Sequence, residues 1–156
     1  MAKALGGGLP IAAVAGKTEV MDAVGAGKVM HVGTMNANPV GLAACKATIE
    51  VLEGGALRTI AGLGRKLIKG IQDIIADKRV QGYGSVFSIF FTNMQEIRDY
   101  RDFLKVDKEK NLDLSRKLLK EGVLVWPPAY GHWFVSGAHT SEDIDRTLEA
   151  MSRVLP

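Results

Sequence analysis

The sequence predicts an α/β fold with a small α+β domain in its second half. After residue 78, short apolar and aromatic runs alternate with helical patterns, which is typical of strands and helices packed in layers. The first half is different, because a glycine-rich apolar segment is followed by two long helical patterns. These observations divide the chain into residues 1–77 and residues 78–156. The first part has too few strands for its own sheet, so we expect it to belong to something larger or to depend on a partner.

The start of the chain predicts a turn, a strand and a short helix. The run IAAVAG, residues 11–16, follows Pro10 and predicts a short buried strand. Residues 18–24 predict a short helix, with Thr18 as its N-cap.

Two long helices complete the first part. Asn38 is a favourable N-cap and Pro39 suits the first helical position, so a helix is expected from there to the glycines at 54–55. A second helix is predicted over residues 57–76, because leucines and isoleucines recur there at three- and four-residue spacing. Three glycines within that range each weaken it by about 1 kcal/mol relative to alanine.

Three segments of the second part predict strands. Residues 79–92 are rich in β-branched and aromatic side chains and predict a strand or hairpin. The run VLVWPP, residues 123–128, predicts a strand cut by Pro127. Residues 132–139 predict another short strand.

Two helices separate and follow these strands. A polar and then helical stretch over residues 99–122 is expected to stop at Gly122. The final helix should begin after Thr140 as N-cap, since Asp143 stands three residues later as in a capping box.

Composition excludes several classes of function. The net charge is +3 and the basic residues are scattered, so no nucleic-acid surface is indicated. No apolar run approaches a membrane span, and no signal peptide is recognisable. The single cysteine, Cys45, favours a reducing compartment, so we expect a cytoplasmic protein. His31, His132 and His139 have no metal-ligand spacing, so no metal is expected.

Lys3 is the lone charge in the opening run MAKALGGGLP. A lysine is nucleophilic when neutral, and burial among apolar groups favours the neutral amine. Such an amine forms a Schiff base with an aldehyde, as with pyridoxal phosphate. The glycines that follow would let the backbone approach a bulky cofactor. The alternative is an exposed lysine beside a flexible glycine run.

Two segments resemble class III (fold type I) pyridoxal-phosphate aminotransferases. AKALGGGLPIAAVAGK resembles the active-site segment of that family, which implies that Lys3 is its Schiff-base lysine. HVGTMNANPVGLAA resembles the Gly-Thr-x-x-x-Asn-Pro segment. This second resemblance implies that Thr34, with Gly33 before it, binds the cofactor phosphate. The family threonine usually serves the neighbouring subunit, so a homodimer is implied.

A third segment, residues 121–151, is similar to the C-terminal domain of glutamate-1-semialdehyde aminomutases. The three similarities together imply the C-terminal portion of the fold type I transferase fold. One departure is present: those aminomutases carry a phenylalanine and a glutamate after the proline pair, whereas this chain has Gly131 and His132 in a stretch one residue shorter. A related ω-aminotransferase is therefore a second interpretation of the resemblance.

The resemblance implies amino-group transfer on a small amino or keto acid or a semialdehyde. Lys3 would hold the cofactor and then move a proton as general base and acid. Family members have a long segment before the lysine, which includes the aspartate that keeps the pyridine nitrogen protonated. We therefore expect this chain to be the C-terminal part of such an enzyme and to show little or no turnover alone.

Two other hypotheses stand beside the enzyme. One is a non-catalytic α/β module that self-associates through its helices. The other is a stand-alone phosphate-binding domain, although proline and strand-like sequence follow the glycines where a helix would be needed. We expect a homodimer or another homo-oligomer, because a missing sheet would leave apolar helix faces uncovered.

Overall fold

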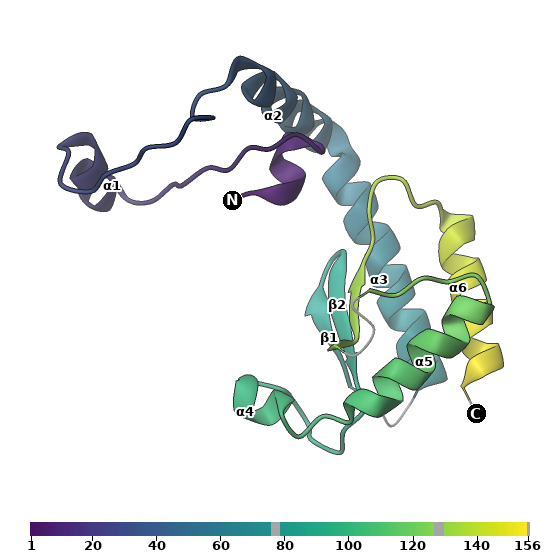
Figure 1. Ribbon diagram of the computed structural model, residues 1–156. Coiled ribbons are helices and arrows are strands. Elements are labelled where there is room, and N and C mark those ends of the chain that lie inside the picture. The colour runs from purple at the N-terminus through teal and green to yellow at the C-terminus, as the bar shows by residue number, and fades with distance from the viewer. Residues whose placement is uncertain (76–78, 127–129, 156) are drawn as a thin grey trace. The chain divides into compact units, whose positions relative to one another are not determined.

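The computed structural model describes residues 1–75, 79–126 and 130–155. Its contacts divide the chain into two compact units, Met1–Ala56 (unit 1) and Leu57–Pro156 (unit 2) (Figure 1). Helices and a small antiparallel sheet confirm the predicted α/β class. The boundary expected after residue 77 falls outside the described residues, and the long helix that starts at Leu57 groups with unit 2.

Unit 1 consists of short helical elements joined by extended chain. They are the 3₁₀ turn η1 (Lys3–Gly6), α1 (Thr18–Gly25), α2 (Pro39–Val51) and the π turn η2 (Leu52–Ala56). The predicted cap of α2 is confirmed, because Asn38 Oδ1 accepts hydrogen bonds from the amides of Val40 and Gly41 at 3.0 and 3.2 Å. Gly55 has a φ of 112°, so the helical path is interrupted at the predicted glycine pair.

Two predictions for unit 1 are wrong. Residues 11–16 form no strand, and only Ala13 has a backbone partner there, the N-terminal residue Met1. A strand needs neighbouring strands, and the described part of unit 1 contains none. Thr18 is not a cap: the cap position is Lys17, whose backbone is extended and whose side chain makes no capping bond.

Unit 2 contains a three-stranded sheet and four helices among its described residues. In chain order they are α3 (Leu57–Ile74), β1 (Arg79–Tyr83), β2 (Val86–Phe90), α4 (Tyr100–Phe103), α5 (Lys108–Lys120), β3 (His132–Phe134) and α6 (Ser141–Val154). The strands run antiparallel in the order β1-β2-β3, with Phe87 opposite Trp133. The predicted hairpin is confirmed. Of the strand predicted over residues 132–139, residues 132–134 form β3 and residues 135–139 lie outside it.

The core of unit 2 lies between one face of this sheet and helices α3, α5 and α6 (Figure 1). Phe87 and Ile89 of β2 and Trp133 of β3 pack there with Ile71 of α3 and Met151 of α6. Alternation along β2 and β3 places these side chains on the same face. Each of these side chains is almost completely removed from water, so the unit has a continuous apolar interior.

Helix ends in unit 2 follow the predicted signals. Thr140 and Asp143 form the capping box of α6, with each side chain accepting a bond from the other residue's backbone amide. At the end of α5, Gly122 has a φ of 83° and its amide bonds to Leu119, while the amide of Val123 bonds to Leu118. These two bonds make a Schellman motif, which closes the helix at the predicted glycine.

The strand predicted over residues 123–128 is wrong in its described part. Residues 123–125 are not in a strand, because the amide of Val123 is used to close α5. Pro127 lies outside the described residues. Within the described ranges, none of the helices is both long enough and apolar enough to cross a bilayer.

Candidate active site

Lys3 opens η1 with a left-handed backbone, at a φ of 57°. This conformation costs a non-glycine residue about 1 kcal/mol. Among the described non-glycine residues, only Ala37 shares it. Strain of this kind concentrates at functional positions. The Lys3 side chain is exposed at a hollow that also includes Gly8 and Pro10, so unit 1 by itself does not surround this amine with the apolar groups that would favour its neutral form.

The three glycines after Lys3 differ in what surrounds the position of their missing side chains. A Cβ at Gly6 would meet the Cγ2 of Ile11 at 2.6 Å, and one at Gly7 would meet the Oγ1 of Thr48 at 2.9 Å. Packing within unit 1 therefore requires the first two. Gly8 has a φ of 107° and nothing within 4 Å of its missing side chain. The open space that a bulky cofactor would need thus lies at the third glycine.

Gly33 and Thr34 lie at the start of an exposed turn that leads into α2. The amide of Asn36 bonds to the carbonyl of Gly33 at 3.1 Å, and a Cβ on Gly33 would meet the Asn36 side chain at 2.8 Å. The hydroxyl of Thr34 has no partner among the described residues, so it is free to donate. Ala37 closes the turn at a φ of 56°.

Lys3 and Thr34 do not line a common hollow within the described chain. The hollow at Lys3 and a second one beside the Thr34 turn share Pro10 and Ile11 at their border. His31 and Asn36 line the second hollow, while Thr34 lines neither. Sequence reasoning did not single out Asn36, although an asparagine close after a glycine is a common turn signal.

The residues of unit 1 fit pyridoxal phosphate at two points. An amine on a strained backbone beside the open space at Gly8 suits the aldehyde, and the free Thr34 hydroxyl suits the phosphate. A third requirement is missing, because no carboxylate that could hold a pyridine nitrogen protonated lines the hollow at Lys3. The fit is therefore that of part of a site.

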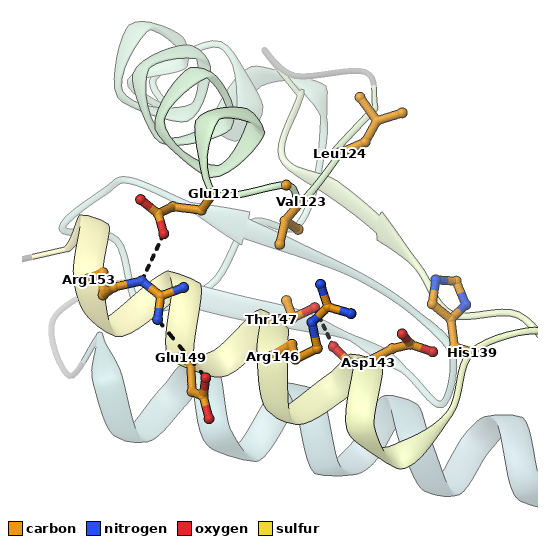
Figure 2. A pocket seen from close by; sticks show the side chains of 10 residues that line it. Glu121, Val123, Leu124, His139, Asp143, Arg146, Thr147, Glu149 and Arg153 are labelled. Carbon is orange, nitrogen blue, oxygen red and sulfur yellow. Dashed lines mark hydrogen bonds and ion pairs between the residues drawn. The ribbon is translucent and has the colours of Figure 1, made fainter.

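Unit 2 has its own hollow between the end of α5 and the side of α6, and Figure 2 shows the side chains that line it. Arg153 lies between Glu121 and Glu149, at 2.8 and 4.0 Å. None of the predicted site residues lies here. Hydrogen bonds from the amide and hydroxyl of Thr140 lower the pKa of Asp143 at the edge of this hollow, so its carboxylate serves the helix cap.

His132 and Gly131, where the sequence departs from the aminomutases, belong to unit 2. The Nδ1 of His132 lies 2.6 Å from the hydroxyl of Ser88 on the adjacent strand, and its ring stacks on Tyr130 at 6.2 Å. Gly131 has a φ of 64° and is packed against Ile89 and Asn111. His132 is thus a half-buried strand residue, as its position in the sequence predicts. The described residues contain no cluster of side chains able to hold a metal.

Comparison with known proteins identifies the family. The sequence profile of the family described as aminotransferase class-III matches residues 1–155. The chain belongs to the class III aminotransferase family. It is 39% identical over 160 residues to the glutamate-1-semialdehyde 2,1-aminomutase of Methanothrix thermoacetophila, and 36% identical over 161 residues to that of Archaeoglobus fulgidus. These matches include 99% of this chain, which spans 37% and 38% of the two relatives.

Solved structures of transaminases share the fold. An ω-transaminase from Sphaerobacter thermophilus matches with a TM-score of 0.80 at 24% identity, over 99% of this chain and 37% of that protein. A glutamate-1-semialdehyde aminomutase from Pseudomonas aeruginosa matches with a TM-score of 0.69 at 21% identity, over 79% of this chain and 28% of that protein. The predicted fold type I class is confirmed, and class III aminotransferases use pyridoxal phosphate.

Proposed function

We propose that this chain provides the lysine and the phosphate-binding turn of a pyridoxal-phosphate-dependent aminotransferase or aminomutase. The observation that carries the proposal is the strained backbone of Lys3 before an open glycine turn, in a chain that matches the family over residues 1–155. The chain spans little more than a third of its relatives, so this is a role within a larger site.

The residues of the site would divide the binding of the cofactor and the transfer of the proton between them. The ε-amine of Lys3 would hold the aldehyde carbon of the cofactor, and the Thr34 hydroxyl with the adjacent Gly33 backbone would bind the phosphate. The bound cofactor supplies an electron sink for a carbanion beside nitrogen. Lys3, as a free amine, would then accept a proton from the amino-bearing carbon of the substrate and return it.

The proposed site takes Thr34 from a second subunit, which makes the intact enzyme a homodimer. The separate hollows of Lys3 and the Thr34 turn support this arrangement. The proposed substrate is a small amino or keto acid or a semialdehyde. His132 and Gly131 stand where the aminomutases carry an acid. Transfer of the amino group to a second keto acid is therefore proposed as the alternative to the aminomutase reaction.

Covalent labelling tests this proposal. The chain is incubated with pyridoxal phosphate, reduced with borohydride and mapped by peptide mass spectrometry. We expect Lys3 to carry most of the label and Lys3→Arg to abolish that part of it. Lys17 and Lys28 are also exposed lysines of unit 1 and serve as internal controls. Equal labelling of all three lysines would favour the non-catalytic, self-associating module. Amino transfer by the chain alone is expected to be negligible.

A further inference from the structure

Unit 2 has an apolar hollow of about 280 Å³ where the middle of α5 lies beside the end of α6. Its apolar walls are Phe91, which follows β2, together with Leu114, Val154 and Leu155. Phe91 and Leu114 belong to the core of the unit, and the other two side chains pack against that core. The hollow is therefore held open by packed residues. A cavity of about 150 Å³ can hold benzene, so this hollow has room for a phenyl ring and a short chain.

A second hollow, of about 490 Å³, adjoins the first at Phe91 and Lys110, which line both. Its other lining residues come from the chain after β2 and from the approach to α5, and they are Thr92, Asn93, Met94, Lys105 and Asp107. The hydroxyl oxygen of Thr92 accepts a bond from the amide of Met94 at 3.2 Å, so the hydroxyl can donate its hydrogen to another group. An apolar hollow beside a polar one suits a ligand with one apolar end and one polar end.

The charged side chains around the two hollows favour an anion. Lysines 105, 110 and 117 and aspartates 107 and 113 line them, so positive charge is in excess. Both carboxylates are already engaged. Asp113 pairs with Lys117 at 2.8 Å. Asp107 is the N-cap of α5, and the bond that it accepts from the amide of Lys110 lowers its pKa.

Two of the lysines can turn toward a ligand. Lys105 and Lys110 are exposed, and their ammonium groups lie 3.4 and 3.5 Å from the nearest carboxylates. Exposed ion pairs contribute little free energy, so an incoming carboxylate can compete for both groups. Hydrogen bonds between an ammonium group and a carboxylate are among the stronger ones in proteins.

We propose that the two hollows form one binding site for a small carboxylate that carries an aromatic or branched aliphatic group. The apolar group lies against Phe91 and Leu114, and the carboxylate lies between Lys105 and Lys110. All of these residues belong to unit 2. The proposal therefore goes beyond the proposed function and does not depend on it.

The experiment is a titration of the full chain with 3-phenylpropionate at pH 7, followed by two-dimensional NMR. We expect saturable shifts at the amides of Thr92, Asn93, Lys110 and Leu114, with a Kd of about 1 mM for a ligand of this size. Two control ligands separate the contributions of the two ends. Acetate lacks the apolar group and 3-phenylpropylamine reverses the charge, so each should bind at least about tenfold more weakly at these residues.

Matched variants of α5 locate the carboxylate. Lys110→Met removes the ammonium group at the border of the two hollows and keeps a flexible side chain of good helix propensity. It should weaken the binding of 3-phenylpropionate at least about fivefold. Lys120 is an exposed lysine of the same helix that lines neither hollow. Lys120→Met should leave the Kd within about twofold.

A third variant locates the apolar end. Val154 is half-buried in the wall of the first hollow, and Val154→Phe should fill the space that the phenyl ring would take. Loss of saturable shifts in this variant, with the fluorescence of the buried Trp133 unchanged, supports the site. If Val154→Phe does not fold, the two lysine variants decide the question.

Four results would overturn the inference. They are no saturable shift at the hollows, equal binding of the amine or of acetate, equal effects of the two lysine variants, and a folded Val154→Phe that still binds. Equal binding of the amine would mean that the hollow accepts any apolar group. Labelling of Lys3 by pyridoxal phosphate and borohydride is independent of all four results, so the proposed function and this site can fail separately.

Discussion

The two units of this chain differ in what holds them together. All of the buried apolar residues among those described lie in unit 2, where three helices and a sheet share one core. Unit 1 has comparable local signals, including the Asn38 cap and the glycine turns, and it forms helices without a core. The difference teaches that caps and turns specify local structure, while stability depends on contacts between distant segments.

Separating the units tests this difference most strongly. Residues 57–156 expressed alone should unfold cooperatively in urea, with a slope of about 1 kcal/mol/M or more. Residues 1–56 alone should show little helix by circular dichroism, because isolated helices of this length are marginal in water. A cooperative transition in residues 1–56 would contradict the comparison.

A matched pair of isoleucine truncations measures the same contrast inside the full chain. Ile71 is 0% exposed in α3 and Ile49 is 40% exposed in α2. Ile71→Ala should lower the free energy of unfolding by about 3 kcal/mol, because it leaves a cavity in the core. Ile49→Ala should change it by less than about 0.5 kcal/mol. Urea denaturation gives both values, and similar losses would show that unit 1 has a core after all.

Two glycines of α3 test how closely this helix packs against the hairpin of unit 2. A Cβ at Gly64 would collide with the backbone of the β1–β2 turn, meeting the Cα of Ser85 at 2.9 Å, whereas one at Gly62 would meet only an Arg65 nitrogen at 3.9 Å. Gly64→Ala should destabilise unit 2 by about 2 kcal/mol through overpacking. Gly62→Ala should stabilise it by up to about 1 kcal/mol through helix propensity. Stabilisation by both would mean that α3 does not approach the hairpin.

The smallest expected effect is a pH dependence of the stability of unit 2. The bonds from Thr140 lower the pKa of Asp143 in the folded state. The stability that this carboxylate contributes is present above its unfolded pKa of about 3.9 and is lost as the pH falls through the lower folded value. Asp143→Asn should therefore reduce the fall in melting temperature on acidification. Asp113→Asn, which removes an exposed carboxyl of α5, should change the fall in melting temperature less.

Much of unit 2 could be predicted from sequence. Thr140 and Asp143 form the box that their spacing predicts, and Gly122 ends α5 where expected. Such signals act over a few residues and need no tertiary contact. Residues 123–125 were misassigned because an amide needed for a strand closes the preceding helix instead. Thr18 was misassigned because the extended backbone of a cap falls at Lys17.

The candidate site divides in the same way. The sequence alone shows the order of Lys3, the glycines, Gly33 and Thr34, and this order predicts the family. That Gly6 and Gly7 serve packing while Gly8 borders open space could not be predicted, because the contact at Gly7 comes from Thr48, which is distant in sequence, and the contact at Gly6 depends on how the chain turns back to bring Ile11 against it. The exposure of Lys3 is likewise a tertiary result.

The sequence by itself determined the long helices, the caps at Asn38 and Thr140, the hairpin and the family, because these depend on neighbouring residues and on motifs. Only the tertiary structure decided that residues 57–156 bury a core and that residues 1–56 do not. The physical reason is that removing apolar surface from water requires packing against other segments of a fold. No local sequence pattern indicates whether those segments are present.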